Sequence, residues 1–195
     1  MTEFVLYLSP GASSMAVHIA LHEVGAAFET RTLSLARKET RTPEFLAINP
    51  AGKVPTLLVD GRPLTEVAGG LFYLAKRFPE AKLLPAGDIE AEAQAVSWMS
   101  FLASTVHPAR RQGQELANEV WQTAQQRLGG NDWALGQYSI VDIHLFRLFW
   151  RVNKWLEPPA GTLDRMFAHH ERMMARPAVR KTIEAETAIG YELPA

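Results

Sequence analysis

The sequence predicts an α/β domain at the N-terminus that is followed by an all-helical domain. Short apolar runs of strand length occur between residues 4 and 64, and the chain beyond residue 88 shows only helical patterns. A stretch with two prolines and a glycine, PEAKLLPAG, separates the two regions. We therefore expect an α/β domain over residues 1–78, a linker over 79–87 and a helical domain over 88–195.

The composition indicates a globular protein with nearly balanced charge. At 195 residues and 47% hydrophobic content, the chain can bury one large core or two small ones. The formal net charge of -1 predicts neither a nucleic-acid partner nor an anionic membrane partner. The sequence shows neither a signal-peptide pattern nor an apolar run of about 18 residues, so we expect a cytoplasmic protein without a membrane span. The absence of cysteine excludes disulfides, Cys-based metal sites and a Cys nucleophile.

The α/β region begins with a strand, a helix and a second strand. Residues 4–8 form an apolar run that suits a buried strand. After a Ser-Pro-Gly break, Ser13 or Ser14 can cap a helix that ends at Gly25. The alternating residues 28–33 predict the second strand.

The same region continues with a short helix, a hairpin and a longer helix. Pro43 suits the first position of a short helix. Residues 54–59 and 62–64 are typical of two strands joined by the Asp-Gly turn at 60–61. A helix is expected over 66–78, so the region forms one unit with helices covering a small mixed sheet.

The second region contains helical patterns only. Ser139 and Asp142 fit a capping box at the start of a helix, with Asp in place of the usual Glu. The other expected helices cover residues 89–106, 118–128, 163–176 and 178–187.

A candidate binding site surrounds the turn-rich loop at residues 49–55. This loop delivers a Val-Pro dipeptide to the start of a strand, and the hairpin returns the chain to a carboxylate at Glu66. The arrangement puts an extended backbone edge, Lys53 and Glu66 around one concavity. We expect a site for a short peptide that carries an amine and carboxylates.

Five motifs together resemble those of bacterial glutathione transferases, closest to the beta class. They are SPGASS at 9–14, NPAGKVP at 49–55, TE at 65–66, VH at 106–107 and GQYSIVD at 136–142. The resemblance covers nearly the whole chain, in the same order and spacing. It implies a thioredoxin-like N-terminal domain, a helical C-terminal domain, a homodimer, glutathione as co-substrate and no metal. It also implies a cis bond before Pro55, which would turn the Val54 backbone toward the cysteinyl residue of glutathione.

The resemblance assigns roles to several residues around that loop. Glu66 would bind the γ-glutamyl amino group, and the backbone N–H of Val67 would bind the γ-glutamyl carboxylate. Many relatives carry Ser at the position of Val67 and gain a hydroxyl there. Lys38 and Lys53 would meet the glycine carboxylate. The alternatives are a plain helix cap for Glu66 and solvated surface side chains for the two lysines.

Ser13 stands where beta-class relatives usually carry Cys, so a mixed disulfide between the protein and glutathione cannot form. In other classes a Ser or Tyr hydroxyl donates a hydrogen bond to the glutathione sulfur. Such a donor favours the thiolate, the nucleophilic form of a thiol whose free pKa is near 8.5. Ser13 or Ser14 could therefore activate glutathione. A plain helix cap is the alternative for both.

His107 matches a His that the beta class places near glutathione. The alternative is a helix-end residue that interacts with the last carbonyls. Adjacent positions that match the family, some of them within reach of a partner subunit's site, are Ser100, Ser104, Thr105 and Val106. The stretch 108–135 looks shorter than in typical relatives, which would leave a wider acceptor site.

The leading hypothesis is an enzyme that conjugates the glutathione thiolate to small hydrophobic electrophiles, as in detoxification. The alternatives are a non-catalytic binding or scaffold protein of the same fold, and a glutathione-dependent isomerase or peroxidase. His18 and His22 share a helix face and could hold a metal, but no third ligand follows at a familiar spacing, so no metal is expected.

Overall fold

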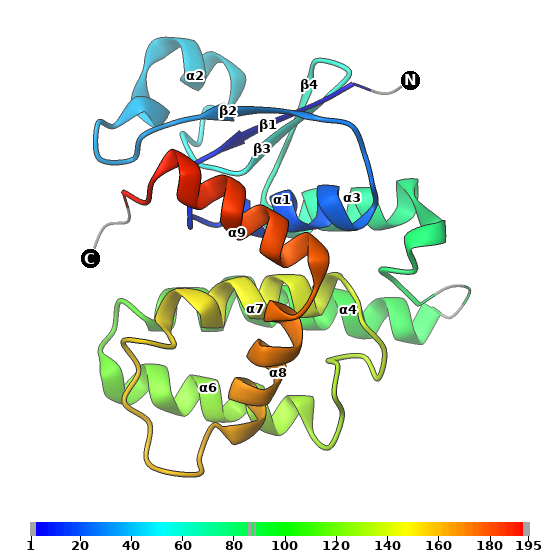
Figure 1. Cartoon of the computed structure of the whole chain (residues 1–195), viewed down its shortest axis with the longest axis vertical. Coiled ribbons are helices and arrows are strands. Elements are labelled where there is room, and N and C mark those ends of the chain that lie inside the picture. The colour runs from blue at the N-terminus through cyan, green and yellow to red at the C-terminus, as the bar shows by residue number, and fades with distance from the viewer. Residues whose placement is uncertain (1–2, 86, 88, 193–195) are drawn as a thin grey trace. The chain divides into compact units, whose positions relative to one another are not determined.

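A computed structural model describes residues 3–85, 87 and 89–192 (Figure 1). The chain forms two compact units, which we call the first and second unit. The first comprises Met1–Arg77 and Pro177–Ala195, and the second comprises Phe78–Arg176. This division differs from the expected one, because the last helix, α9 (Pro177–Ile189), packs against the first helix, α1 (Ser14–Glu23). Thr182 and Glu186 of α9 are wholly buried in that packing.

The first unit contains a four-stranded mixed sheet with the strand order β2-β1-β3-β4. The strands are β1 (Phe4–Leu8), β2 (Glu29–Thr32), β3 (Thr56–Val59) and β4 (Arg62–Thr65). β1 pairs in parallel with β2 and antiparallel with β3, which pairs antiparallel with β4. The hairpin turn has positive φ at both Asp60 and Gly61, as the expected Asp-Gly turn requires. The predicted strands are confirmed.

Helices cover both faces of this sheet. In Figure 1, α1, α9 and α3 (Val67–Arg77) lie on one side, and α2 (Pro43–Ile48) lies on the other. Phe45 of α2 packs with Val5 and Tyr7 of β1. α1 and α3 pack closely, because a Cβ added at Gly70 would lie 3.1 Å from Val17 Cγ2. This is the thioredoxin-like arrangement that the resemblance implied.

The regular secondary structure in the described residues of the second unit is all helical. Its main helices are α4 (Ile89–Phe101), α6 (Gln114–Leu128), α7 (Ile140–Val152) and α8 (Asp164–Met174). Nearly all of α7 is buried, and Phe149 packs edge-to-face against Trp121 of α6. α6 begins four residues before the expected start, since the Gln114 side chain bonds the backbone of Trp155 and Glu157.

The expected helix over 89–106 is interrupted near its end. Leu102–Val106 is a π-helical turn, and the short α5 (His107–Ala109) follows it. The His107 N–H donates to the Leu102 carbonyl five residues back. Pro108 accounts for this π-helical turn, because proline has no N–H and its ring crowds the carbonyl four residues earlier. A wider turn relieves that crowding.

The expected capping box at the start of α7 is confirmed. Ser139 Oγ accepts from the Val141 N–H at 3.2 Å, and Asp142 Oδ2 accepts from the Ser139 N–H at 2.9 Å. Asp142 Oδ1 also accepts from the Ala134 N–H and contacts His169 Nε2. The capping residues are wholly buried, so the box holds the core of the second unit in place. No helix in the described part of the chain is long and apolar enough to span a membrane.

Candidate functional site

The register of the sheet brings the predicted glutathione-binding segments of the first unit to one edge. Leu8 at the end of β1 pairs with Thr32 at the end of β2. Tyr7 pairs with Thr56 at the start of β3, which pairs with Thr65 at the end of β4. The segments at 9–14, 33–41, 49–55 and 66–67 therefore all meet the sheet at this edge, which we call the site edge.

Asn49 organises the loop that leads into β3. Its Nδ2 donates to the Lys53 carbonyl and to Thr56 Oγ1, both at 2.9 Å, and its Oδ1 accepts from the Ala51 N–H. Asn49 is almost fully buried, so these bonds are shielded from water. These bonds hold the loop backbone in place. The motif at residues 49–55 includes Asn49, but the motif alone does not indicate that its side chain organises the loop.

The same loop contacts the segment that follows β2. Gly52 has a φ of +59°, and a Cβ there would lie 2.7 Å from the Thr40 carbonyl oxygen. Arg41 Nη1 donates to the Ala51 carbonyl at 3.3 Å. The Val54–Pro55 bond is cis, as the resemblance implied. Lys53 and Lys38 are exposed, and both belong to segments at the site edge.

Glu66 lies between β4 and α3 in an uncommon backbone conformation. Its φ is +67°, a region that non-glycine residues seldom occupy and that is found more often at functional sites. Its side chain is exposed, and its carbonyl accepts from the Gly70 N–H. Val67 begins α3, so its backbone N–H belongs to the first turn, which has no acceptor within the helix. The buried Val67 side chain offers only packing.

Ser13 and Ser14, the two serines that were predicted to activate glutathione, differ in burial and in hydrogen bonding. Ser14 is wholly buried, and its hydroxyl accepts from the Ser9 N–H at 3.1 Å and donates to the Ser9 carbonyl at 3.2 Å. Ser13 is half-buried and occupies the N-cap position of α1, but its side chain makes no capping hydrogen bond. The capping expectation is thus wrong for the Ser13 side chain, and Ser13 has the more available hydroxyl of the two.

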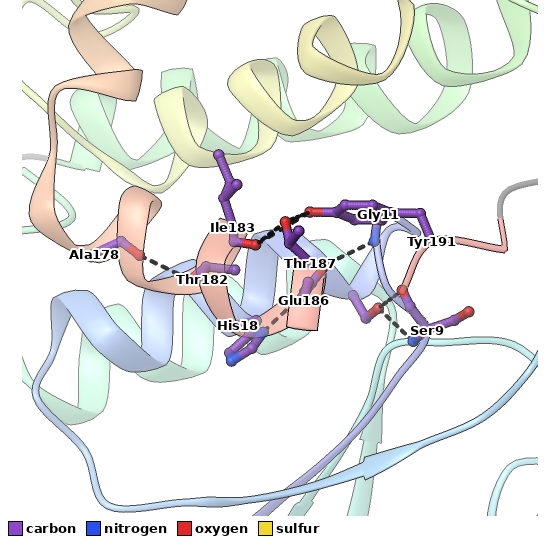
Figure 2. Close-up of polar contacts among 10 residues, drawn as sticks. Ser9, Gly11, His18, Ala178, Thr182, Ile183, Glu186, Thr187 and Tyr191 are labelled. Atoms are coloured by element: carbon purple, nitrogen blue, oxygen red, sulfur yellow. Dashed lines mark hydrogen bonds and ion pairs between the residues drawn. The ribbon is translucent and has the colours of Figure 1, made fainter. Parts of the chain in front are cut away.

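A buried carboxylate from the other end of the chain supports this serine loop. Glu186 Oε2 accepts from the Gly11 N–H at 2.6 Å, and Glu186 Oε1 accepts from His18 Nδ1 at 2.9 Å (Figure 2). Since a carboxylate can only accept, His18 Nδ1 carries the hydrogen. Glu186 lies 175 residues from Gly11 along the chain, so no local signal in the sequence indicated this contact.

His18 and His22, which share one face of α1, make contacts within the protein. Nδ1 of His18 faces Glu186, and the two imidazole rings lie 5.0 Å apart. Burial, with smaller contributions from His18 and Lys181, lowers the pKa of His22 to about 4, so the ring is neutral near pH 7. Among the described residues, no group of three or more His, Cys, Asp or Glu side chains could hold a metal ion.

The remaining predicted contacts all belong to the second unit. His107 is half-buried, directly after the π-helical turn. Val106 is buried, so its side chain serves the core of that unit. The other three predicted residues have exposed side chains: Ser100, Ser104 and Thr105.

Comparison with known proteins gives consistent matches along the chain. Residues 3–76 match the family described as "Glutathione S-transferase, N-terminal domain". The chain is 30% identical to "Glutathione S-transferase GstA" of Escherichia coli O157:H7, over 93% of this chain and 98% of that protein. The structure of a glutathione S-transferase from Xylella fastidiosa superposes with a TM-score of 0.84 at 30% identity, covering 94% of this chain and 98% of that one. A sphingomonad glutathione S-transferase complexed with glutathione superposes with a TM-score of 0.81 at 33% identity, with the same coverage.

Proposed function

The chain belongs to the glutathione S-transferase family, and from this premise we propose that it binds glutathione at the site edge and conjugates it to small hydrophobic electrophiles. The observation that carries the proposal is the sheet register, which brings the loops of Ser13, Val54 and Glu66 to one edge. The bonds of Asn49 to the Lys53 carbonyl and to Thr56 Oγ1 hold the backbone on either side of Val54.

Glutathione binding would use both backbone hydrogen bonds and charged side chains. The Val54 backbone pairs with the cysteinyl residue, as a strand pairs with a sheet edge. The exposed Glu66 carboxylate accepts from the γ-glutamyl ammonium, and the Val67 N–H donates to the γ-glutamyl carboxylate. Lys38 and Lys53 supply positive charge for the glycine carboxylate. The ammonium and the glycine carboxylate would thus each meet a group of opposite charge, and the γ-glutamyl carboxylate would meet a backbone donor at a helix N-terminus.

Activation of the thiol would rest on Ser13. Its hydroxyl, which caps nothing, donates to the glutathione sulfur and stabilises the thiolate, while the thiol proton leaves to solvent. The thiolate then forms a carbon–sulfur bond with the electrophile, and the leaving group departs with its electron pair. Ser14 has a structural role instead, since its hydroxyl is hydrogen-bonded to the backbone N–H and carbonyl of Ser9.

The first test is a titration of the protein with glutathione, in which the thiolate absorbance is followed across pH. We expect saturable binding and a bound-thiol pKa below the free value of about 8.5. Ser13→Ala should raise that pKa and lower turnover, with binding of glutathione retained. Absence of binding at millimolar glutathione would refute the proposal and favour a scaffold protein of the same fold. Binding with a lowered pKa but no conjugation would favour the isomerase or peroxidase alternative.

We further propose a cytoplasmic homodimer, as the family resemblance implies. Sedimentation equilibrium on the purified protein tests the dimer directly. A mass of 21.7 kDa at micromolar concentration, which is that of one chain, would contradict it.

A further inference from the structure

The C-terminal segment of the first unit contacts two loops of the site edge. One loop, at residues 9–14, carries Ser13, and we call it the serine loop. The other, at residues 33–41, carries Lys38, and we call it the lysine loop. The two loops follow β1 and β2, which are adjacent parallel strands. The proposed function assigns the glutathione sulfur to the serine loop and the glycine carboxylate to the lysine loop.

Glu186 of α9 contacts the serine loop. Its Oε2 accepts from the Gly11 N–H at 2.6 Å, two residues before Ser13 (Figure 2). Its Oε1 accepts from His18 Nδ1 at 2.9 Å, and the Glu186 side chain is wholly buried. A carboxylate acceptor that is shielded from water makes a strong hydrogen bond. A residue of the C-terminal helix therefore fixes the backbone that leads to Ser13.

The lysine loop is built around the side chain of Ser34, which is 6% exposed. The Ser34 hydroxyl accepts from the Arg37 N–H at 3.1 Å, and the Ser34 N–H donates to Glu39 Oε2 at 2.7 Å. Lys38 follows with a φ of +56°, a region that non-glycine residues seldom occupy. Such a conformation persists only where the surrounding contacts hold it. The position of Lys38 thus depends on the hydrogen bonds of Ser34.

Glu192 adds a contact to the lysine loop from beyond the end of α9. The chain turns at Gly190, where φ is +99°. Glu192 Oε2 then accepts from the Ser34 hydroxyl, and Glu192 Oε1 lies 3.7 Å from Arg37 Nη1. The Arg37 and Glu192 side chains are exposed, so their ion pair contributes little to stability. The bond to Ser34 matters more, because it directs the hydroxyl hydrogen to Glu192 and leaves the oxygen as the acceptor for the Arg37 N–H.

We propose that Glu186 and Glu192 are positioning residues, which hold the serine loop and the lysine loop in the conformations that bind glutathione. We call residues 186–192 the C-terminal clamp. The inference rests on the proposed function, in which the two loops meet different parts of the peptide. A loop that leaves its binding conformation for part of the time weakens the contact that it supplies, in proportion to that time. Loss of Glu186 should therefore affect the ionisation of the bound thiol, and loss of Glu192 should affect the affinity for glutathione.

A titration with glutathione across pH separates the two effects, because it gives both the Kd for the protonated thiol and the pKa of the bound thiol. Glu192→Ala should raise that Kd about three- to tenfold and leave the bound-thiol pKa unchanged. Glu186→Ala should raise the bound-thiol pKa by about 0.5–1 and leave that Kd unchanged. A general loss of stability would not divide in this way between the two variants.

Conservative variants and two controls on α9 complete the titration. Glu186→Gln and Glu192→Gln each keep an acceptor for the loop, so both should retain most of the wild-type behaviour. Glu184→Gln removes an exposed carboxylate, and Thr182→Val changes a wholly buried side chain; both should leave the Kd and the thiol pKa unchanged. Should Glu186→Ala fail to fold, Glu186→Asp makes the same test, because its shorter side chain draws the carboxylate away from the Gly11 N–H.

Three results of this titration would overturn the inference. The first is that Glu186→Ala and Glu192→Ala change the Kd and the thiol pKa in the same proportion. The second is that neither variant changes either quantity. The third is that Thr182→Val reproduces one of the two effects, since a buried substitution elsewhere on α9 would then suffice.

Amide hydrogen exchange in the protein without glutathione tests the clamp independently of the proposed function. The Gly11 N–H reports on the serine loop and the Arg37 N–H on the lysine loop, while the Leu33 N–H, bonded to the end of β1, is the reference. Glu186→Ala should speed exchange at Gly11 alone and Glu192→Ala at Arg37 alone, each about three- to tenfold. This pattern in a protein that binds no glutathione would refute the proposed function and still support the clamp. Equal changes at all three amides would overturn the clamp, whether or not glutathione binds.

Discussion

Replacement of Glu186 by alanine removes the buried carboxylate that joins the two ends of the first unit. The change leaves the Gly11 N–H and His18 Nδ1 without the acceptor that they contact at 2.6 and 2.9 Å. Glu186 is wholly buried and His18 is 2% exposed, so water cannot replace the lost bonds without rearrangement. Each buried donor that loses its acceptor costs about 1–3 kcal/mol, so for these two donors we expect a loss of about 3–5 kcal/mol. For a chain of this length we expect the melting temperature to fall by about 6–20 °C.

Two further variants separate the hydrogen bonds from the loss of volume. Glu186→Gln has nearly the same size and keeps an acceptor for the Gly11 N–H, so it should cost only about 1–2 kcal/mol. Thr182→Val changes another wholly buried residue of α9, whose hydroxyl donates to the Ala178 carbonyl of its own helix. It should cost about 1 kcal/mol. Urea denaturation of the three variants gives the free energies of unfolding. An alanine variant that loses less than about 1 kcal/mol, or a glutamine variant as unstable as alanine, would refute the reasoning.

Three further predictions concern binding, packing and pH. Glu66→Gln should weaken glutathione binding about tenfold in a calorimetric titration, with Glu44→Gln unaffected, since a charge-assisted bond to the ammonium is lost. Gly70→Ala should lower the free energy of unfolding by about 1 kcal/mol, although alanine favours helix more than glycine does, because the new Cβ would lie 3.1 Å from Val17 Cγ2. Gly69→Ala should instead raise the free energy of unfolding, because its new Cβ would lie at an ordinary 3.6 Å from Leu64 Cδ1. Urea denaturation of both variants measures the two free energies. The pKa of His22 is about 4 in the folded protein and 6.5 in the unfolded chain, so the unfolded chain binds the proton at the higher pH. The free energy of unfolding should therefore decline as the pH falls from about 6.5 to about 4. A His22→Gln variant whose stability declines as steeply over this range would contradict the assignment.

Most of the fold could be predicted because its signals are local. The apolar run at Phe4–Leu8, the Asp-Gly turn and the capping box of Ser139 with Asp142 each concern residues within a few positions of one another. The π-helical turn at Leu102–Val106 was missed, since only the effect of Pro108 on a preceding carbonyl indicates it. The order of strands and helices along the chain, by contrast, follows directly from the spacing of the apolar residues.

The candidate site was predicted less completely, for a physical reason. Side chains such as Glu66 and Lys53 could be placed near one another from the hairpin alone. The difference between Ser13 and Ser14 depends on which hydroxyl the fold buries, and adjacent identical residues carry no such information. The contact of Glu186 with Gly11 joins opposite ends of the sequence and becomes visible only in three dimensions.

The place of α9 in the first unit bears on how the protein is made. A ribosome delivers the N-terminal strands and helices first, yet α1 packs against a helix that begins at Pro177. The Glu186 carboxylate that accepts from the Gly11 N–H is therefore synthesised 175 residues after Gly11. Translation that stops before α9 would release a nascent chain with the buried His18 uncovered, which is the kind of defect that cellular quality control recognises.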